Sequence, residues 1–133
     1  MTRRSIAVAI GIGCRAGCPA EAIEGVIRLA LERVPDARPA GLFTVADKSG
    51  EAGMIAAARA LGFPLIPLPR EALRAQKGCV ETRSPASEAA FGVPSVAEAS
   101  ALAGYGAGAV LLVSRVAKYG ATCAVAGSAR TPE

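Results

Sequence analysis

The sequence predicts a single three-layer α/β domain, in which helices cover both faces of a mostly parallel sheet of about five strands with an antiparallel last strand. Apolar runs alternate with segments of helical periodicity along the chain. The first run, residues 3–12, is apolar almost throughout, as expected of a strand that is buried on both faces. Neither a repeat nor a linker interrupts the 133 residues, so residues 1–133 are expected to form one domain.

Two helices are expected in the first half of the chain. A helix is predicted over residues 19–34, because Pro19 suits a first helical position and apolar residues recur at helical spacing. These residues are Ile23, Val26, Ile27, Ala30, Leu31 and Val34. A strand is expected at residues 40–46, followed by a helix over residues 51–61 with Gly62 as its C-terminal cap.

The middle of the chain is expected to be less regular. A short strand over residues 64–68 contains prolines that cannot donate to a β-ladder, so it is placed at a sheet edge. A brief helix is predicted over residues 69–76. In the irregular stretch that follows, Ser84 and Pro85 begin a helix of one or two turns, which Gly92 ends.

One helix and two strands are expected to complete the domain. Ser95 and Glu98 have the spacing of a capping box, which predicts a helix that starts there and ends near Ala103. A strand is expected at residues 109–113, followed by a loop or bulged hairpin. The last strand, residues 121–126, is expected to be antiparallel to its predecessor because the link between them is short.

Composition restricts the classes of partner. The net charge of +4 favours an acidic small molecule, whereas the lack of a basic run or basic–aromatic interleaving argues against nucleic acid. No apolar stretch approaches the ~20 residues needed to span a membrane. The first apolar run is too short for a signal peptide. We therefore expect a cytoplasmic protein that contacts no membrane; its oligomeric state is not predicted.

The sequence has no histidine and four cysteines, Cys14, Cys18, Cys79 and Cys123. Histidine is the commonest general base and metal ligand. Three residues separate Cys14 from Cys18, rather than the two of a typical zinc or redox pair, and no second pair follows. We therefore expect free thiols, no metal site and no cofactor.

The most informative stretch is the glycine-rich segment between the first strand and the first helix. Gly11 and Gly13 allow the backbone to approach a ligand closely. The unpaired N–H groups at the start of the next helix favour anions, and Arg15 adds a positive charge. The segment therefore predicts an anion-binding loop.

A nucleotide is one alternative ligand for this loop. A dinucleotide fingerprint would need a third glycine where the sequence has Ala16, and Lys48 beside Asp47 is poorly suited to binding a ribose. The Gly-Lys-Ser/Thr of a phosphate-binding P-loop is also absent. A small nucleotide-binding module is therefore kept as an alternative prediction.

Three polar loops are expected to meet at one rim of the sheet, because loops that follow parallel strands gather there. They span residues 11–17, 47–51 and 114–118. The candidate ligand-binding residues on them are Gly11, Gly13, Cys14, Arg15, Asp47, Lys48, Ser49, Arg115 and Lys118. Arginines can form bidentate pairs with carboxylates or phosphates, and lysines act as point charges. The alternative is that these loops are simply polar and face water.

Two residues are candidates for catalysis. Cys14, beside Arg15 and expected at a helix N-terminus, has surroundings that lower a thiol pKa, so it is a candidate nucleophile. The alternative is a small residue that fills the turn. Glu51 is a candidate general base, or else it caps its own helix. The capping box accounts for Ser95 and Glu98, so no chemical role is expected for them.

Four segments, in this order, resemble the cobalamin-biosynthesis family formed by CobE and the C-terminal domain of CbiG. They are residues 11–15 with the following helix, 44–51, 92–101 and 111–126. The resemblance implies a role in building the corrin ring of vitamin B12. The implied partner is a precorrin or a hydrogenobyrinic-acid-like tetrapyrrole, and other enzymes of the corrin pathway are candidate partners.

The resemblance leaves three roles open: carrier, accessory factor or enzyme. The longer relatives look like hydrolases that open a ring-A lactone of a cobalt-precorrin, of the precorrin-5A type, and release acetaldehyde. They carry further N-terminal domains, so this chain is expected to be the standalone form. The enzymatic alternative is therefore a hydrolase that acts on a carbon–carbon bond of a precorrin lactone.

Overall fold

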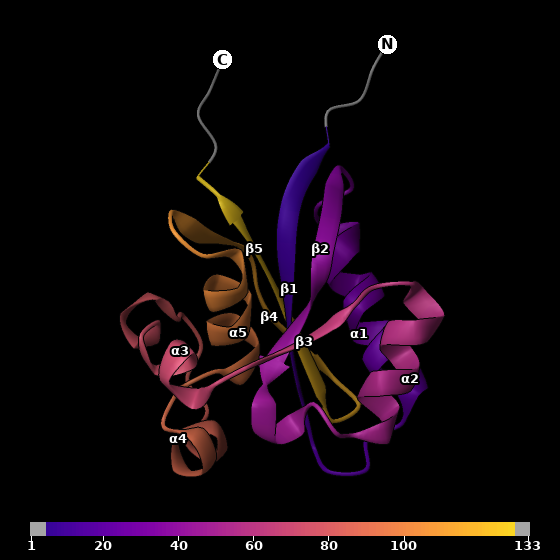
Figure 1. The fold of residues 1–133 in the computed structure, drawn as a ribbon, viewed down its shortest axis with the longest axis horizontal. Coiled ribbons are helices and arrows are strands. Elements are labelled where there is room, and N and C mark those ends of the chain that lie inside the picture. The colour runs from indigo at the N-terminus through magenta and orange to yellow at the C-terminus, as the bar shows by residue number, and fades with distance from the viewer. Residues whose placement is uncertain (1–4, 130–133) are drawn as a thin grey trace.

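The computed structural model describes residues 5–129 and has one five-stranded sheet with helices on both faces (Figure 1). The elements are β1 (Ile6–Cys14), α1 (Ala20–Glu32), β2 (Ala37–Val45), η1 (Ala46–Lys48), α2 (Ala52–Leu61), β3 (Leu65–Leu68), α3 (Arg70–Arg74), η2 (Lys77–Cys79), α4 (Pro85–Phe91), α5 (Val96–Tyr105), β4 (Ala109–Lys118) and β5 (Ala121–Ser128). The strand order is β3-β2-β1-β5-β4, so the first strand lies at the centre of the sheet.

The strand pairings confirm the predicted fold class. β1 pairs in parallel with β2, and β2 pairs in parallel with β3. β5 lies between β1 and β4 and is antiparallel to both. Four strands therefore run in one direction and the last strand runs in the other. β3 is at an edge of the sheet, as its prolines predict.

The core has a layer on each face of β1. On one face, Val8, Ile10 and Ile12 belong to the same buried cluster as the apolar residues of α1 and α2. On the other face, α5 packs closely against the strand, because Gly11 has no side chain. A Cβ added at Gly11 would lie 1.9 Å from the carbonyl oxygen of Ala97 in α5.

Several predicted element ends differ from those in the structure. β1 extends to Cys14, and the predicted positions Arg3 and Arg4 lie outside the described residues. Pro19 is the N-cap of α1 rather than its first helical residue, since its ψ of 153° is extended. Gly62 caps α2 with a φ of 77°, as predicted, because glycine tolerates the left-handed conformation.

The largest difference concerns the segment predicted as a loop or bulged hairpin. Residues 114–118 belong to β4, and only Tyr119 and Gly120 join β4 to β5. The register of β4 against β5 shifts twice before Val116, so the predicted bulging is confirmed. Within residues 5–129, no helix is both long and apolar enough to cross a membrane.

Candidate functional site

A cavity of about 350 Å³ opens where β1 ends, and its walls come from segments far apart in the sequence. The strands contribute Gly13, Cys14, Arg115 and Thr122, the loops that follow β1 and β4 contribute Arg15 and Gly120, and η1 contributes Lys48. The opposite wall comes from α4 and the start of α5, through Ser84, Ala86, Ser87, Ala90, Phe91, Ser95 and Val96. The cavity therefore has a basic side and a largely apolar side that carries hydroxyl groups.

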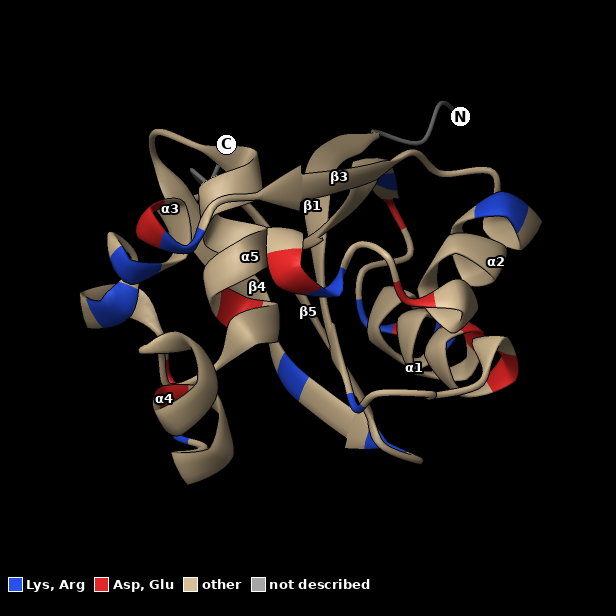
Figure 2. Ribbon diagram, turned by 60° about the horizontal axis from the view of Figure 1, so that its bottom comes forward, with Lys and Arg blue, Asp and Glu red and all other residues tan. Residues whose placement is uncertain are grey.

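Three basic side chains line this cavity. Figure 2 shows basic positions on β4 and on the neighbouring loops at this end of the molecule. The ammonium group of Lys48 lies 3.8 Å from the carboxylate of Glu51. Among residues 5–129, no acidic side chain forms an ion pair with the guanidinium of Arg15 or Arg115. Both guanidinium groups are therefore available for bidentate pairing with an anion.

The loop that carries Arg15 is held by both neighbouring segments. The N–H of Arg15 donates to the carbonyl of Gly120, at 3.1 Å, in the turn between β4 and β5. The N–H of Gly17 donates to Oε1 of Glu51 at 2.9 Å, from the start of α2. These contacts connect the predicted segments 11–17 and 47–51 with each other and with the turn between β4 and β5.

Glu98 in α5 has a structural role that the capping box does not explain. Its side chain is fully buried and accepts four hydrogen bonds. The donors are the N–H groups of Glu81, Thr82 and Arg115 and the hydroxyl of Thr82, at 2.7, 2.9, 2.8 and 2.7 Å. Because β4 is bulged near Arg115, this N–H is available to Glu98. The carboxylate thus holds the chain before α4 against the strand that carries Arg115.

The expected capping box is only half right. The hydroxyl of Ser95 accepts from the N–H of Glu98 at 3.2 Å, as predicted, but the Glu98 carboxylate bonds to distant segments instead of completing the box. Burial acts to raise the pKa of Glu98, yet the hydrogen bonds from Arg115, Thr82 and Glu81 outweigh it and hold the pKa below its ordinary value. The expectation that the Glu98 side chain completes the capping box is therefore wrong.

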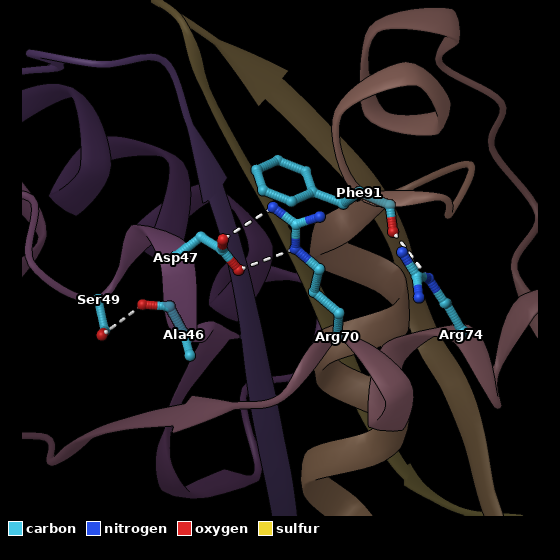
Figure 3. A network of polar contacts seen from close by, with 6 residues as sticks. All are labelled: Ala46, Asp47, Ser49, Arg70, Arg74 and Phe91. Atoms are coloured by element: carbon cyan, nitrogen blue, oxygen red, sulfur yellow. Dashed lines mark hydrogen bonds and ion pairs between the residues drawn. The ribbon is translucent and has the colours of Figure 1, made fainter.

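A second polar network joins η1 to α3 and α4 (Figure 3). Arg70 donates to both carboxylate oxygens of Asp47, at 3.2 and 2.8 Å. Its guanidinium carbon also lies 5.3 Å from the centre of the Phe91 ring, at the end of α4. Nε of Arg74 donates to the Phe91 carbonyl at 3.4 Å. The hydrogen bond from Arg70 lowers the pKa of Asp47.

Five of the predicted ligand-binding residues line the cavity, namely Gly13, Cys14, Arg15, Lys48 and Arg115. The other four, Gly11, Asp47, Ser49 and Lys118, are outside its lining. Gly11 packs against α5, and Asp47 pairs with Arg70. The hydroxyl of Ser49 donates to the carbonyl of Ala46, three residues before it. Lys118 lies over the ring of Tyr119.

Cys14 differs from the prediction in both position and acidity. It is the last residue of β1 and lies well before α1 begins, so no helix N-terminus acts on it. Burial, helped by the nearby Cys18 thiol, raises the pKa of Cys14 to about 11, and Lys48 opposes this only in part. The expected lowering of the pKa is therefore wrong. A nucleophilic role for Cys14 stays a prediction, and it would need a base.

Glu51 occupies the N-cap position of α2, but its side chain makes no capping hydrogen bond. Its carboxylate instead contacts the Gly17 N–H and the Lys48 ammonium group. The capping alternative is therefore wrong, and the role of general base stays a prediction. Across residues 5–129, no three Cys, Asp or Glu residues are grouped so that they could hold a metal ion.

Comparisons with known proteins agree with this architecture. A family model described as "Cobalamin synthesis G C-terminus" matches residues 8–126. CobE, a protein from the cobalamin (vitamin B12) biosynthetic pathway, has a similar solved structure, with a TM-score of 0.86 and 27% identity; the match covers 97% of this chain and 95% of CobE. A search of the curated proteins finds no match.

Two further solved structures are similar. The cobalamin biosynthesis protein chiG from Agrobacterium tumefaciens str. C58 is 32% identical, with a TM-score of 0.71, over 92% of this chain and 99% of that one. A cobalamin biosynthesis protein G homolog from Sulfolobus solfataricus is 22% identical, with a TM-score of 0.64, and supports the fold alone. That match covers 95% of this chain and 38% of the homolog. The chain therefore belongs to the cobalamin synthesis G C-terminus family and is a protein of cobalamin biosynthesis.

Proposed function

We propose that the cavity binds a precorrin or hydrogenobyrinic-acid-type tetrapyrrole by its carboxylate side chains. The observation that carries this proposal is that Arg15 and Arg115 line one cavity, and no described acidic side chain pairs with either. Intermediates of corrin synthesis carry acetate and propionate groups around the ring. Guanidinium groups bind carboxylates bidentately, and Lys48 adds a third positive charge.

The opposite wall suits the ring rather than its substituents. Ala86, Ala90 and Phe91 of α4 and Val96 of α5 present apolar surface across the cavity from the arginines. A conjugated macrocycle with carboxylates at its periphery has the same division between apolar and anionic parts. This match, together with membership of a cobalamin-biosynthesis family, favours a tetrapyrrole over a nucleotide.

The site favours binding, as a carrier or accessory factor, over catalysis. The candidate base Glu51 already accepts a hydrogen bond from Gly17 and contacts Lys48. The candidate nucleophile Cys14 has a pKa of about 11, so its thiol is protonated at neutral pH. Release of acetaldehyde from a lactone-bearing precorrin by the purified chain would contradict this preference and support the hydrolase alternative.

The test is a titration with hydrogenobyrinic acid, followed by the absorbance of the macrocycle. Arg15→Ala and Arg115→Ala are each expected to weaken binding about tenfold or more, as for the loss of a hydrogen bond to a charged group. Arg28→Ala is the matched control, because Arg28 is an exposed arginine of α1 outside the cavity lining. The proposal fails if the wild-type chain does not bind, or if Arg15→Ala binds as tightly as Arg28→Ala.

A further inference from the structure

The turn between β4 and β5 contains a residue in an unfavourable conformation. Tyr119 and Gly120 are its two central residues, with φ values of 57° and 84°. Two positive φ values are the pattern of a type I′ hairpin turn, which favours Asn followed by Gly. Among residues 5–129, Tyr119 is the only residue other than glycine with a positive φ. A bulky side chain in the left-handed region is strained, and such strain is often found at functional positions.

The side chain of Tyr119 contributes no packing that would offset this strain. It is 71% exposed, against 39% for Ile55 and 37% for Val110, the other exposed large apolar residues of the described chain. The ammonium group of Lys118 lies over its ring, 5.2 Å from the ring centre. An aromatic ring with a cation over it therefore projects into solvent.

The residue that carries this exposed ring is next in sequence to a cavity-lining residue, and its backbone is held in place. Gly120, the neighbour of Tyr119, lines the cavity, and its carbonyl accepts the N–H of Arg15 at 3.1 Å. The Cys18 thiol donates to the carbonyl of Tyr119 at 3.7 Å. The turn is thus attached to the loop that carries the predicted anion-binding arginine.

We propose that Tyr119 and Lys118 form an external platform that stacks against the part of a tetrapyrrole projecting from the cavity. This inference rests on the proposed function. A cavity of about 350 Å³ is near the lower end of the range that holds a drug-sized ligand, roughly 300–1,000 Å³. A macrocycle of four pyrrole rings with its carboxylates is larger than such a ligand, so only one edge fits. The aromatic face of Tyr119 contacts the outer ring surface, and Lys118 pairs with a peripheral carboxylate.

The test uses a variant in which fold stability and binding change in opposite directions. Tyr119→Asn introduces the residue that the turn prefers, so the melting temperature is expected to rise by about 3 °C. The same variant lacks the aromatic ring, so hydrogenobyrinic acid is expected to bind about five- to tenfold more weakly than to the wild-type chain. Tyr119→Phe keeps the ring and is expected to restore the wild-type affinity.

Citrate has carboxylates but no ring. Its binding therefore distinguishes stacking of Tyr119 on the macrocycle from an effect of Tyr119 on the position of the Arg15 loop. Its affinity is expected to be equal for wild type and Tyr119→Asn, because it contacts the arginines alone. An equal loss of citrate and macrocycle binding would overturn the platform, since Tyr119 would then act by placing the Arg15 loop. Unchanged macrocycle binding by Tyr119→Asn would also overturn it, while leaving the cavity site intact. Absence of binding to the wild-type chain would instead reject the proposed function.

Discussion

The two sides of the cavity are held in different ways. On the side of β4, the buried carboxylate of Glu98 accepts four hydrogen bonds, one of them from the backbone of Arg115. On the side of α4, no helix residue is fully buried. Phe91, at the C-terminal end of the helix, is partly buried against an apolar cluster that includes Leu73 and Val96, and it also contacts Arg70 and Arg74. Buried hydrogen bonds to a charged group stabilise a fold far more than exposed polar contacts do.

This difference suggests how one site handles a ligand with two kinds of surface. Carboxylate recognition needs fixed geometry, because bidentate pairing tolerates little displacement of a guanidinium. The buried network fixes the backbone from which the Arg115 side chain extends. Contact with an apolar ring has no such directional requirement. Because no residue of α4 is fully buried, we expect this helix to adjust to the macrocycle more readily than the backbone of Arg115 can.

The largest effect is expected from removal of the buried carboxylate. Glu98→Ala leaves several N–H groups without an acceptor and should lower the free energy of unfolding by about 3–5 kcal/mol. Urea denaturation measures this change. Glu88→Ala is the control, because Glu88 of α4 is a partly exposed acid, and its effect should be within about 1 kcal/mol. Equal losses for the two variants would contradict the difference between the two sides.

The next effect is the pH dependence of stability. The folded-state pKa of Glu98 lies below the ordinary value of 4.5. Its contribution is therefore fully present above pH 4.5 and is lost as the pH falls through the folded-state value. Urea denaturation from pH 6 downward should show a steeper loss of stability for the wild-type chain than for Glu98→Gln. Parallel curves for the two proteins would show that the Glu98 carboxylate is not stabilised by its hydrogen bonds.

A smaller and local effect is expected from the surface network. Arg70→Ala removes the ion pair with Asp47 and the contact with the Phe91 ring. Amide hydrogen exchange should become faster in α4, while exchange in α5 stays as in the wild-type chain, because α5 is buried against the sheet. Asp47→Asn separates the two contributions, since it weakens the pair without deleting the cation over Phe91. Faster exchange throughout the chain after Arg70→Ala would contradict a local role.

The smallest effect is expected in the alkylation rate of Cys14, the thiol that lines the cavity at the end of β1. Iodoacetamide should alkylate Cys14 more slowly than the exposed Cys79 at pH 7, because burial raises the Cys14 pKa to about 11. The rate at Cys14 should increase as the pH approaches that value, as peptide mass spectrometry can follow. Rapid alkylation of Cys14 at neutral pH would support the nucleophile prediction instead.

Patterns within a short stretch of sequence predict those helices and strands whose form depends mainly on their own residues. The helical spacing of Ile23, Val26 and Ile27 predicts α1, and the prolines of β3 predict an edge strand, because each signal lies within one element. Residues 114–118 are predicted to form a loop or bulged hairpin, since Ser114, Arg115 and Lys118 are polar or charged. β4 continues through them because β5 supplies a partner.

The candidate site was predicted only in part, because its contacts join residues distant in sequence. Arg15 and Lys48 follow recognisable strands, so their meeting at one rim could be expected. The partners of Glu98 lie in the irregular segment before α4 and in β4, and no local pattern identifies them. One signal was present: Glu98 is the only charged residue of α5, among small and apolar neighbours. Such a lone acid is expected to need a buried partner.

A crystal structure of the chain with hydrogenobyrinic acid would show directly whether the cavity binds the carboxylates of a tetrapyrrole. Electron density for one edge of the macrocycle is expected in the cavity at the end of β1. Carboxylates should pair with Arg15 and Arg115, with the ring between the arginines and α4. A macrocycle bound elsewhere on the chain, with both guanidinium groups still free, would contradict the proposed function.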